Sequence, residues 1–118
     1  MRDFKKLEVW KGAHEIALSV YLLSSNFPKE EIYGLTSQIR RCAVSIPSNI
    51  SEGCGRSTEN ELRRFCDIAM GSASELEYQL LLAFDLNFIQ TDTYEKINNE
   101  LIVLKKRLNA FIQKLKSK

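Results

Sequence analysis

Arginine side chains gather in the middle of the sequence. Arg40 and Arg41 are adjacent, and Arg56, Arg63 and Arg64 follow within the same stretch of 25 residues. A guanidinium group is planar, always charged, and shaped to donate two parallel hydrogen bonds to phosphate oxygens. These residues therefore predict a basic surface that binds the phosphate backbone of a nucleic acid.

Charge is also distributed unevenly further along the chain. Residues 65–95 include six acidic residues and no lysine or arginine, whereas residues 105–118 include six basic residues and no acid. Lys105 and Lys106, at the start of the basic stretch, are predicted to extend the arginine surface. The alternative is a solvated face that complements the negative end of the last helix dipole.

Residue patterns that support catalysis or metal binding are scarce. His14 is the only histidine, so a multi-histidine zinc site is excluded. We expect His14 to be a surface or boundary residue. Glu75 and Glu77 are two residues apart and point to different faces of a helix, which prevents them from acting as an acid/base pair. We therefore expect no enzyme, no metal and no cofactor; only a buried pocket around Glu52 would reopen the question.

Three cysteines, Cys42, Cys54 and Cys66, are spaced by twelve residues. That number and spacing fit neither a disulfide framework nor a zinc site, so reduced thiols are expected. The charged N-terminus is followed by no apolar signal region, and no window approaches the ~18 apolar residues of a membrane span. These features predict a cytoplasmic protein with no membrane partner.

Apolar residues recur at steps of three and four in four segments, and none alternates as a half-buried strand does. The pattern predicts an all-α fold in a single domain over residues 1–118. Short connections place consecutive helices antiparallel, so the expected architecture is an up-and-down four-helix bundle. The predicted helices span residues 7–25, 31–53, 58–86 and 92–116.

Several residues predict local features of these helices. Pro47, inside the second helix, removes one backbone hydrogen bond and predicts a kink; the alternative is a helix broken at Ile46. Thr58 and Asp92, each followed three residues later by glutamate, predict capped starts for the third and fourth helices. Gly71, within a stretch of small residues, predicts close approach of another helix.

Polar residues of the second helix have a structural interpretation besides nucleic-acid binding. Asn49 and Glu52 would form hydrogen bonds across the bundle and fix its register. In the same interpretation, Arg40 or Arg41 would pair with a carboxylate of the third helix. Apolar residues outside the main face of the third helix indicate either an oligomer interface or a wider core: Ile68, Leu81 and Leu82.

Residues 38–53, QIRRCAVSIPSNISEG, resemble the signature of four-helix-bundle proteins encoded in intervening sequences of bacterial 23S rRNA genes. The resemblance continues through residues 7–10, 27–31 and 75–77. It marks Asn49, Glu52 and Gly53 as a structural polar signature and implies a ring-like homopentamer. The family includes the accessory variability protein of diversity-generating retroelements, which binds nucleic acid and a reverse transcriptase.

Two functions follow as hypotheses. The first is a non-enzymatic homo-oligomer, a pentamer by resemblance, that binds RNA or DNA through the predicted arginine and lysine surface. The second is a protein–protein scaffold or accessory subunit that makes no direct contact with nucleic acid. The expected partners are therefore other copies of the chain, a nucleic acid, or another protein.

Overall fold

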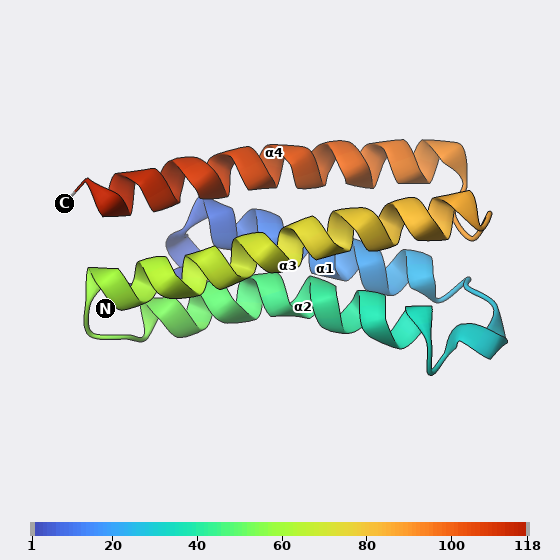
Figure 1. The fold of residues 1–118 in the computed structure, drawn as a ribbon, viewed down its shortest axis with the longest axis horizontal. Helices are drawn as coiled ribbons and strands as arrows, with labels where there is room; N and C mark the ends of the chain where they lie inside the picture. Colours follow the sequence, from blue (N-terminus) through green and yellow to red (C-terminus); the bar gives the residue numbers. More distant parts are fainter. Residues whose placement is uncertain (1, 118) are drawn as a thin grey trace.

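A computed structural model describes residues 2–117, which form four long α-helices (Figure 1). Two short 3-10 turns, η1 (Phe4–Lys6) and η2 (Lys29–Glu31), precede the first and second helices. No strand occurs in the described part of the chain, so the predicted all-α class is confirmed. The helices are α1 (Glu8–Ser24), α2 (Leu35–Cys54), α3 (Glu59–Asp85) and α4 (Thr91–Lys116).

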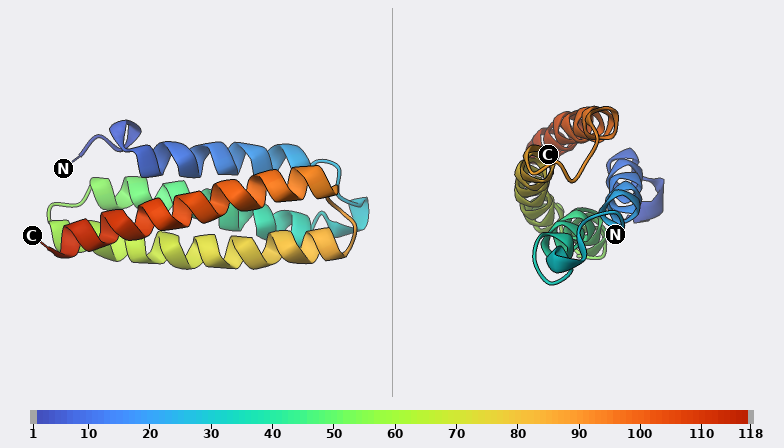
Figure 2. Two further views of the ribbon diagram at one scale, coloured as in Figure 1. Left: turned by 90° about the horizontal axis from the view of Figure 1, so that it is seen from above. Right: turned by 90° about the vertical axis from the view of Figure 1, so that its right-hand side faces the viewer.

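Successive helices run in opposite directions and pack side by side, as predicted for an up-and-down bundle (Figures 1 and 2). The contact between α2 and α3 is the most extensive, and α1 and α4 also pack against each other. The bundle measures 45 × 24 × 20 Å. None of the helices formed by residues 2–117 has the length and apolar character needed to cross a membrane.

The core lies along the axis shared by the four helices. Each helix turns one apolar face inward because its apolar residues recur every three or four positions. Burial of such side chains supplies most of the free energy that stabilises a bundle. Fully buried examples from the four helices are Val20, Ile46, Leu76 and Leu108.

The second helix begins at Leu35, four residues later than predicted. Residues 29–31 instead form the separate turn η2, and Gly34 adopts φ −111° and ψ −115°, which is not a helical conformation. The Glu31 carboxylate accepts a hydrogen bond from the Leu35 backbone N–H at 3.0 Å. A glutamate from the preceding turn therefore satisfies one of the donors exposed at the start of α2.

The starts of the other long helices differ in how they are capped. Thr58 precedes α3 and its hydroxyl accepts a hydrogen bond from the Glu61 N–H at 3.1 Å, so the predicted cap is confirmed. Asp92, in contrast, lies inside the first turn of α4. Gln90 occupies the capping position without a side-chain hydrogen bond, so the cap predicted at Asp92 is wrong.

Pro47 is buried inside one continuous helix, so the alternative of a break at Ile46 is wrong. The Asn49 side-chain amide donates to the Ser45 carbonyl at 2.8 Å and approaches the Ser45 hydroxyl at 3.2 Å. The Ser45 hydroxyl in turn shares a hydrogen bond with that of Ser72 on α3, at 2.6 Å. Polar side chains around the proline thus link α2 to α3.

Gly53, rather than Gly71, lies at a close contact between two helices. A Cβ atom at Gly53 would lie 2.9 Å from Phe65 Cβ and 3.0 Å from Leu62 Cδ1, both on α3. A Cβ atom at Gly71 would meet nothing within 4 Å. The contact predicted at Gly71 is therefore absent within the described chain, because this residue lies on the outer face of α3.

Candidate nucleic-acid interface

The residues predicted to bind nucleic acid lie in three separate places. Arg56, Arg63 and Arg64 surround the α2–α3 connection. Arg40 and Arg41 lie in the second turn of α2, about 24 Å from Arg56 along a helix that rises 1.5 Å per residue. The third group, midway along α4, is Lys105 and Lys106. The seven residues are therefore spread along the length of the bundle.

Arg40 is engaged by the last turn of α1. Its Nε donates to the Ser24 hydroxyl at 2.7 Å, and its Nη2 donates to the Tyr21 carbonyl at 3.3 Å. Its guanidinium carbon also lies 4.9 Å from the centroid of the Tyr21 ring. Since the last turn of α1 has no basic residue of its own, Arg40 supplies the positive charge that stabilises this helix end.

The predicted ion pairs with the acidic residues of α3 are not formed by either arginine of α2. Arg41 is exposed and, among residues 2–117, donates only to Ser37 on its own helix, at 3.4 Å. Glu77 pairs instead with Lys105 of α4, at 2.7 Å. Lys106 is exposed and has no ion-pair partner within residues 2–117.

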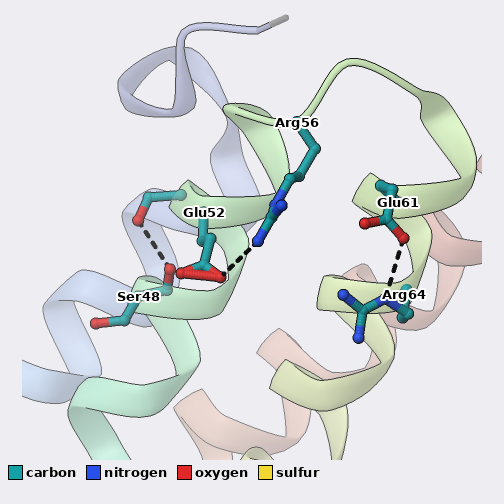
Figure 3. Close-up of polar contacts among 6 residues, drawn as sticks. Ser48, Glu52, Arg56, Glu61 and Arg64 are labelled. Carbon is teal, nitrogen blue, oxygen red and sulfur yellow. Dashed lines mark hydrogen bonds and ion pairs between the residues drawn. The ribbon is translucent and has the colours of Figure 1, made fainter.

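Arg56 and Arg64 cover the same aromatic ring at the α2–α3 connection. Their guanidinium carbons lie 4.9 and 4.6 Å from the centroid of the Phe65 ring. Arg56 also pairs with Glu52 at 3.5 Å, and Arg64 pairs with Glu61 at 3.1 Å (Figure 3). The ring and the two carboxylates thus hold both arginines near each other.

The N-terminal segment, the α2–α3 connection and the C-terminal end of α4 lie at the same end of the molecule (Figure 2), and each contributes cations. The backbone N–H of Arg2 donates to the Cys54 carbonyl at 3.1 Å, and the Arg2 guanidinium pairs with the Glu59 carboxylate at 3.1 Å. This anchors the N-terminal segment beside the α2–α3 connection. We call this end of the bundle the basic end; its cations are Arg2, Lys5, Lys6, Arg56, Arg63, Arg64, Lys114 and Lys116.

Sequence reasoning missed Arg2, Lys5 and Lys6 as members of this group. The signal was available, because in an up-and-down bundle the residues before the first helix lie at the same end as the second connection and the C-terminus. Lys118, the last residue of the predicted basic stretch, lies outside the described residues. Arg63 is half-buried and has no ion-pair partner among residues 2–117.

The three residues of the polar signature have different roles. Asn49 forms hydrogen bonds within α2, and Glu52 is an exposed partner of Arg56, so the hydrogen bonds predicted across the bundle are not formed by either residue. Gly53 permits the close contact between α2 and α3. The link across these helices comes instead from Ser45 and Ser72.

The three cysteines are buried free thiols. Burial raises the pKa of Cys42 and of Cys66 to about 12, and it raises the pKa of Cys54 above its ordinary value. The Cys42 thiol donates to the Ser72 carbonyl at 3.1 Å. Thiols of this kind stay protonated and are poor nucleophiles.

The fold and the basic end together define a small all-α protein whose cations gather where both termini meet the α2–α3 connection. A model of the 23S rRNA-intervening sequence protein family matches residues 5–110. The chain belongs to that family.

A solved structure supports the same relationship. It is a crystal structure of a protein of unknown function from the S23 ribosomal protein family of Bacteroides thetaiotaomicron. The two chains are 28% identical, the match covers 88% of this chain and 97% of that one, and the TM-score is 0.78. A comparison with curated proteins finds no match.

Proposed function

We propose that the protein is a non-enzymatic, cytoplasmic homo-oligomer that binds nucleic acid, preferably RNA, through its basic end. The observation that supports this proposal is the convergence of eight cationic side chains from three parts of the sequence. Five of them have no ion-pair partner within residues 2–117 and remain available to phosphates: Lys5, Lys6, Arg63, Lys114 and Lys116.

Self-association is the second part of the proposal, and its support is the outer face of α3. Ile68 and Leu81 are each 42% exposed, Tyr78 is 61% exposed, and Gly71 has open space beside it. A wider core does not explain Ile68 and Leu81, whereas Leu82 does pack against the core. Exposed apolar residues around a glycine suit close packing of a second copy; a pentamer is the state that the family resemblance implies.

Fluorescence anisotropy with labelled single-stranded RNA, duplex RNA and DNA at two salt concentrations tests the binding. Alanine at Lys5, Lys6 and Arg63 together removes three phosphate contacts, so the affinity and its salt dependence should both fall. The matched control replaces three exposed cations nearer the opposite end, Lys29, Arg41 and Lys96, with alanine. An affinity that does not fall as the salt concentration rises, or an equal loss of affinity in the control variant, would contradict the proposal.

Light scattering tests the self-association. Ile68→Glu with Leu81→Glu places charges on the outer face of α3 and should reduce the mass to that of one chain without changing the helical content. A wild-type chain that is monomeric at micromolar concentration would refute this part of the proposal.

A protein–protein scaffold is a second candidate, favoured by the surface at the other end of the bundle. An open groove of about 1030 Å³ lies between α1 and the α3–α4 connection and is lined in part by Leu22, Leu23, Phe84, Phe88 and Ile97. Leu22 is 75% exposed, and nearby apolar side chains of this kind mark protein interaction sites. An oligomer that binds none of the nucleic acids tested would favour this candidate.

A further inference from the structure

Arg56 and Arg64 come from different elements but lie over one ring. Arg56 follows the end of α2, and Arg64 lies in the second turn of α3. Because their guanidinium carbons are 4.9 and 4.6 Å from the centroid of Phe65, the two carbons are at most about 9.5 Å apart. Their spacing is therefore limited by the ring of Phe65, a residue that is only 6% exposed.

Packing beneath the ring reinforces this arrangement. Gly53 lies directly against Phe65, where a Cβ atom would approach Phe65 Cβ to 2.9 Å. The base of the Phe65 side chain therefore lies against the α2 backbone at Gly53. A guanidinium group that stacks on a buried aromatic side chain loses less side-chain entropy on binding a ligand than a free surface arginine does.

Most of the hydrogen-bond donors of the two arginines have no partner among the described residues 2–117 and can bind a ligand. Arg56 uses Nη2 for Glu52, and Arg64 uses Nε for Glu61. A guanidinium has five N–H donors, and its planar fork matches two phosphate oxygens. The carboxylates compete with such a ligand, because they are anions already bound to the same groups.

We propose that Arg56 and Arg64, stacked on Phe65, clamp two neighbouring phosphate groups of a nucleic-acid strand, and that Glu52 and Glu61 are internal competitors that lower the affinity. This inference rests on the proposed nucleic-acid function and adds the phosphate-binding residues and their regulation. The clamp accounts for two arginines held near one another, whereas Lys5, Lys6 and Arg63 supply general attraction.

Anisotropy titrations with a labelled single-stranded RNA separate the clamp from general charge attraction. Arg56→Lys with Arg64→Lys keeps both charges but loses the planar fork, so affinity should fall about tenfold while the salt slope stays nearly unchanged. Arg56→Ala with Arg64→Ala removes both contacts, so the slope should also fall by about 1.4.

The competitor role predicts a gain of affinity. Glu52→Gln with Glu61→Gln releases both arginines and should raise RNA affinity severalfold. The matched control, Glu30→Gln with Glu95→Gln, makes the same change in net charge at two exposed residues of the opposite end. An equal gain in the two double variants would contradict competition at the clamp.

Phe65→Leu tests the ring itself, with a thermal melt to establish that the variant is folded. A folded variant should bind RNA more weakly, as the lysine variant does. If Arg56→Lys with Arg64→Lys retains wild-type affinity while alanine at Lys5, Lys6 and Arg63 abolishes binding, the clamp is wrong and the proposed function stands.

A wild-type chain that binds no nucleic acid would overturn the proposed function, and the clamp then has its own test. Inorganic pyrophosphate, which also presents two linked phosphates, is titrated while the side-chain Nε resonances of Arg56 and Arg64 are followed by NMR. Shifts of both resonances that are reduced in the Phe65→Leu variant support an anion clamp. The absence of any shift would refute it.

Discussion

Arg40 lies between α1 and α2, where its guanidinium meets the carboxyl end of α1. The Ser24 hydroxyl accepts from Arg40 Nε and donates to the Tyr21 carbonyl at 3.3 Å. The carbonyls of a last helical turn lack backbone partners within the helix, so a cation that reaches them stabilises the helix end. Arg41, the next residue, points to solvent and makes no comparable contact. Two adjacent arginines thus have different surroundings.

Replacement of Arg40 by alanine should lower the free energy of unfolding by about 1 to 2 kcal/mol, because charged hydrogen bonds to α1 are lost. Arg41→Ala is the matched control and should change it by less than about 0.5 kcal/mol. Urea denaturation monitored by circular dichroism measures both. Equal effects of the two substitutions would refute the structural role of Arg40.

Glu61 is a second residue with an influential partner, because Arg64 lowers the pKa of its carboxyl group. The hydrogen bond from Arg64 is the main cause that lowers the pKa of Glu61 below its ordinary value of 4.5. A lowered pKa in the folded chain means that the unfolded chain binds this proton first as the pH falls. The contribution to stability is therefore complete above pH 4.5 and disappears as the pH falls through the lowered value.

An NMR titration of the Glu61 carboxyl should give a midpoint below 4.5 in the wild-type chain. Arg64→Ala removes the hydrogen bond and should move that midpoint up toward the ordinary value. Glu59, in the same first turn of α3, offers a comparison, since its ion-pair partner is Arg2 rather than Arg64. An unchanged Glu61 midpoint in the Arg64→Ala variant would contradict the assignment of cause.

At the scale of the elements, α2 and α3 form the tightest pair in the bundle. Their contact depends on Gly53, where a side chain would meet Phe65 and the backbone of Leu62, whose Cα would lie 3.3 Å away. Further along, the two hydroxyls of Ser45 and Ser72 meet between the helices. Gly71 lies on α3 as well, but it faces away from the core.

These two glycines give a matched pair of substitutions. Gly53→Ala forces the α2 and α3 backbones apart and should destabilise the fold by about 1 to 3 kcal/mol. Gly71→Ala adds a methyl group in open space and should stabilise the monomeric fold by about 1 kcal/mol, since alanine favours helix. Thermal or urea unfolding of both variants, measured in the Ile68→Glu with Leu81→Glu background that keeps the chain monomeric, gives the difference; effects of the same sign would contradict this packing.

The whole molecule has ends of different character. The basic end collects eight cations from the N-terminal segment, the α2–α3 connection and the end of α4, three of them paired with Glu52, Glu59 and Glu61. The opposite end combines the acidic residues Asp85, Asp92 and Glu95 with Lys29 and Lys96. The three buried thiols lie in the one core that all four helices share. Access to them therefore requires the bundle to open.

Cys42, Cys54 and Cys66 should react with a thiol-alkylating reagent only when the chain unfolds. Burial and raised pKa keep them protonated at pH values where an exposed cysteine is already ionised. The rate of alkylation should rise with urea in parallel with the unfolded fraction. Rapid reaction of any thiol in the folded chain would show that part of the core opens by itself.

The sequence by itself determined the four helices, because the spacing of apolar residues specifies which face of each helix is buried. It also determined the cap at Thr58, which depends on residues only three apart. The late start of α2 was harder to predict, since it depends on the conformation of Gly34 and on the Glu31 side chain. Family membership was recognisable from residues 38–53.

Only the tertiary structure decided which charged residues act together. Arg40 donates a hydrogen bond to Ser24 of α1, Lys105 pairs with Glu77, and Arg2 pairs with Glu59. These partners are distant in sequence. The positions of charged residues along the chain do not reveal such partners, because the packing of the helices brings them together. The physical reason is that periodicity is a local property, whereas a binding surface depends on the directions in which separate helices present their side chains.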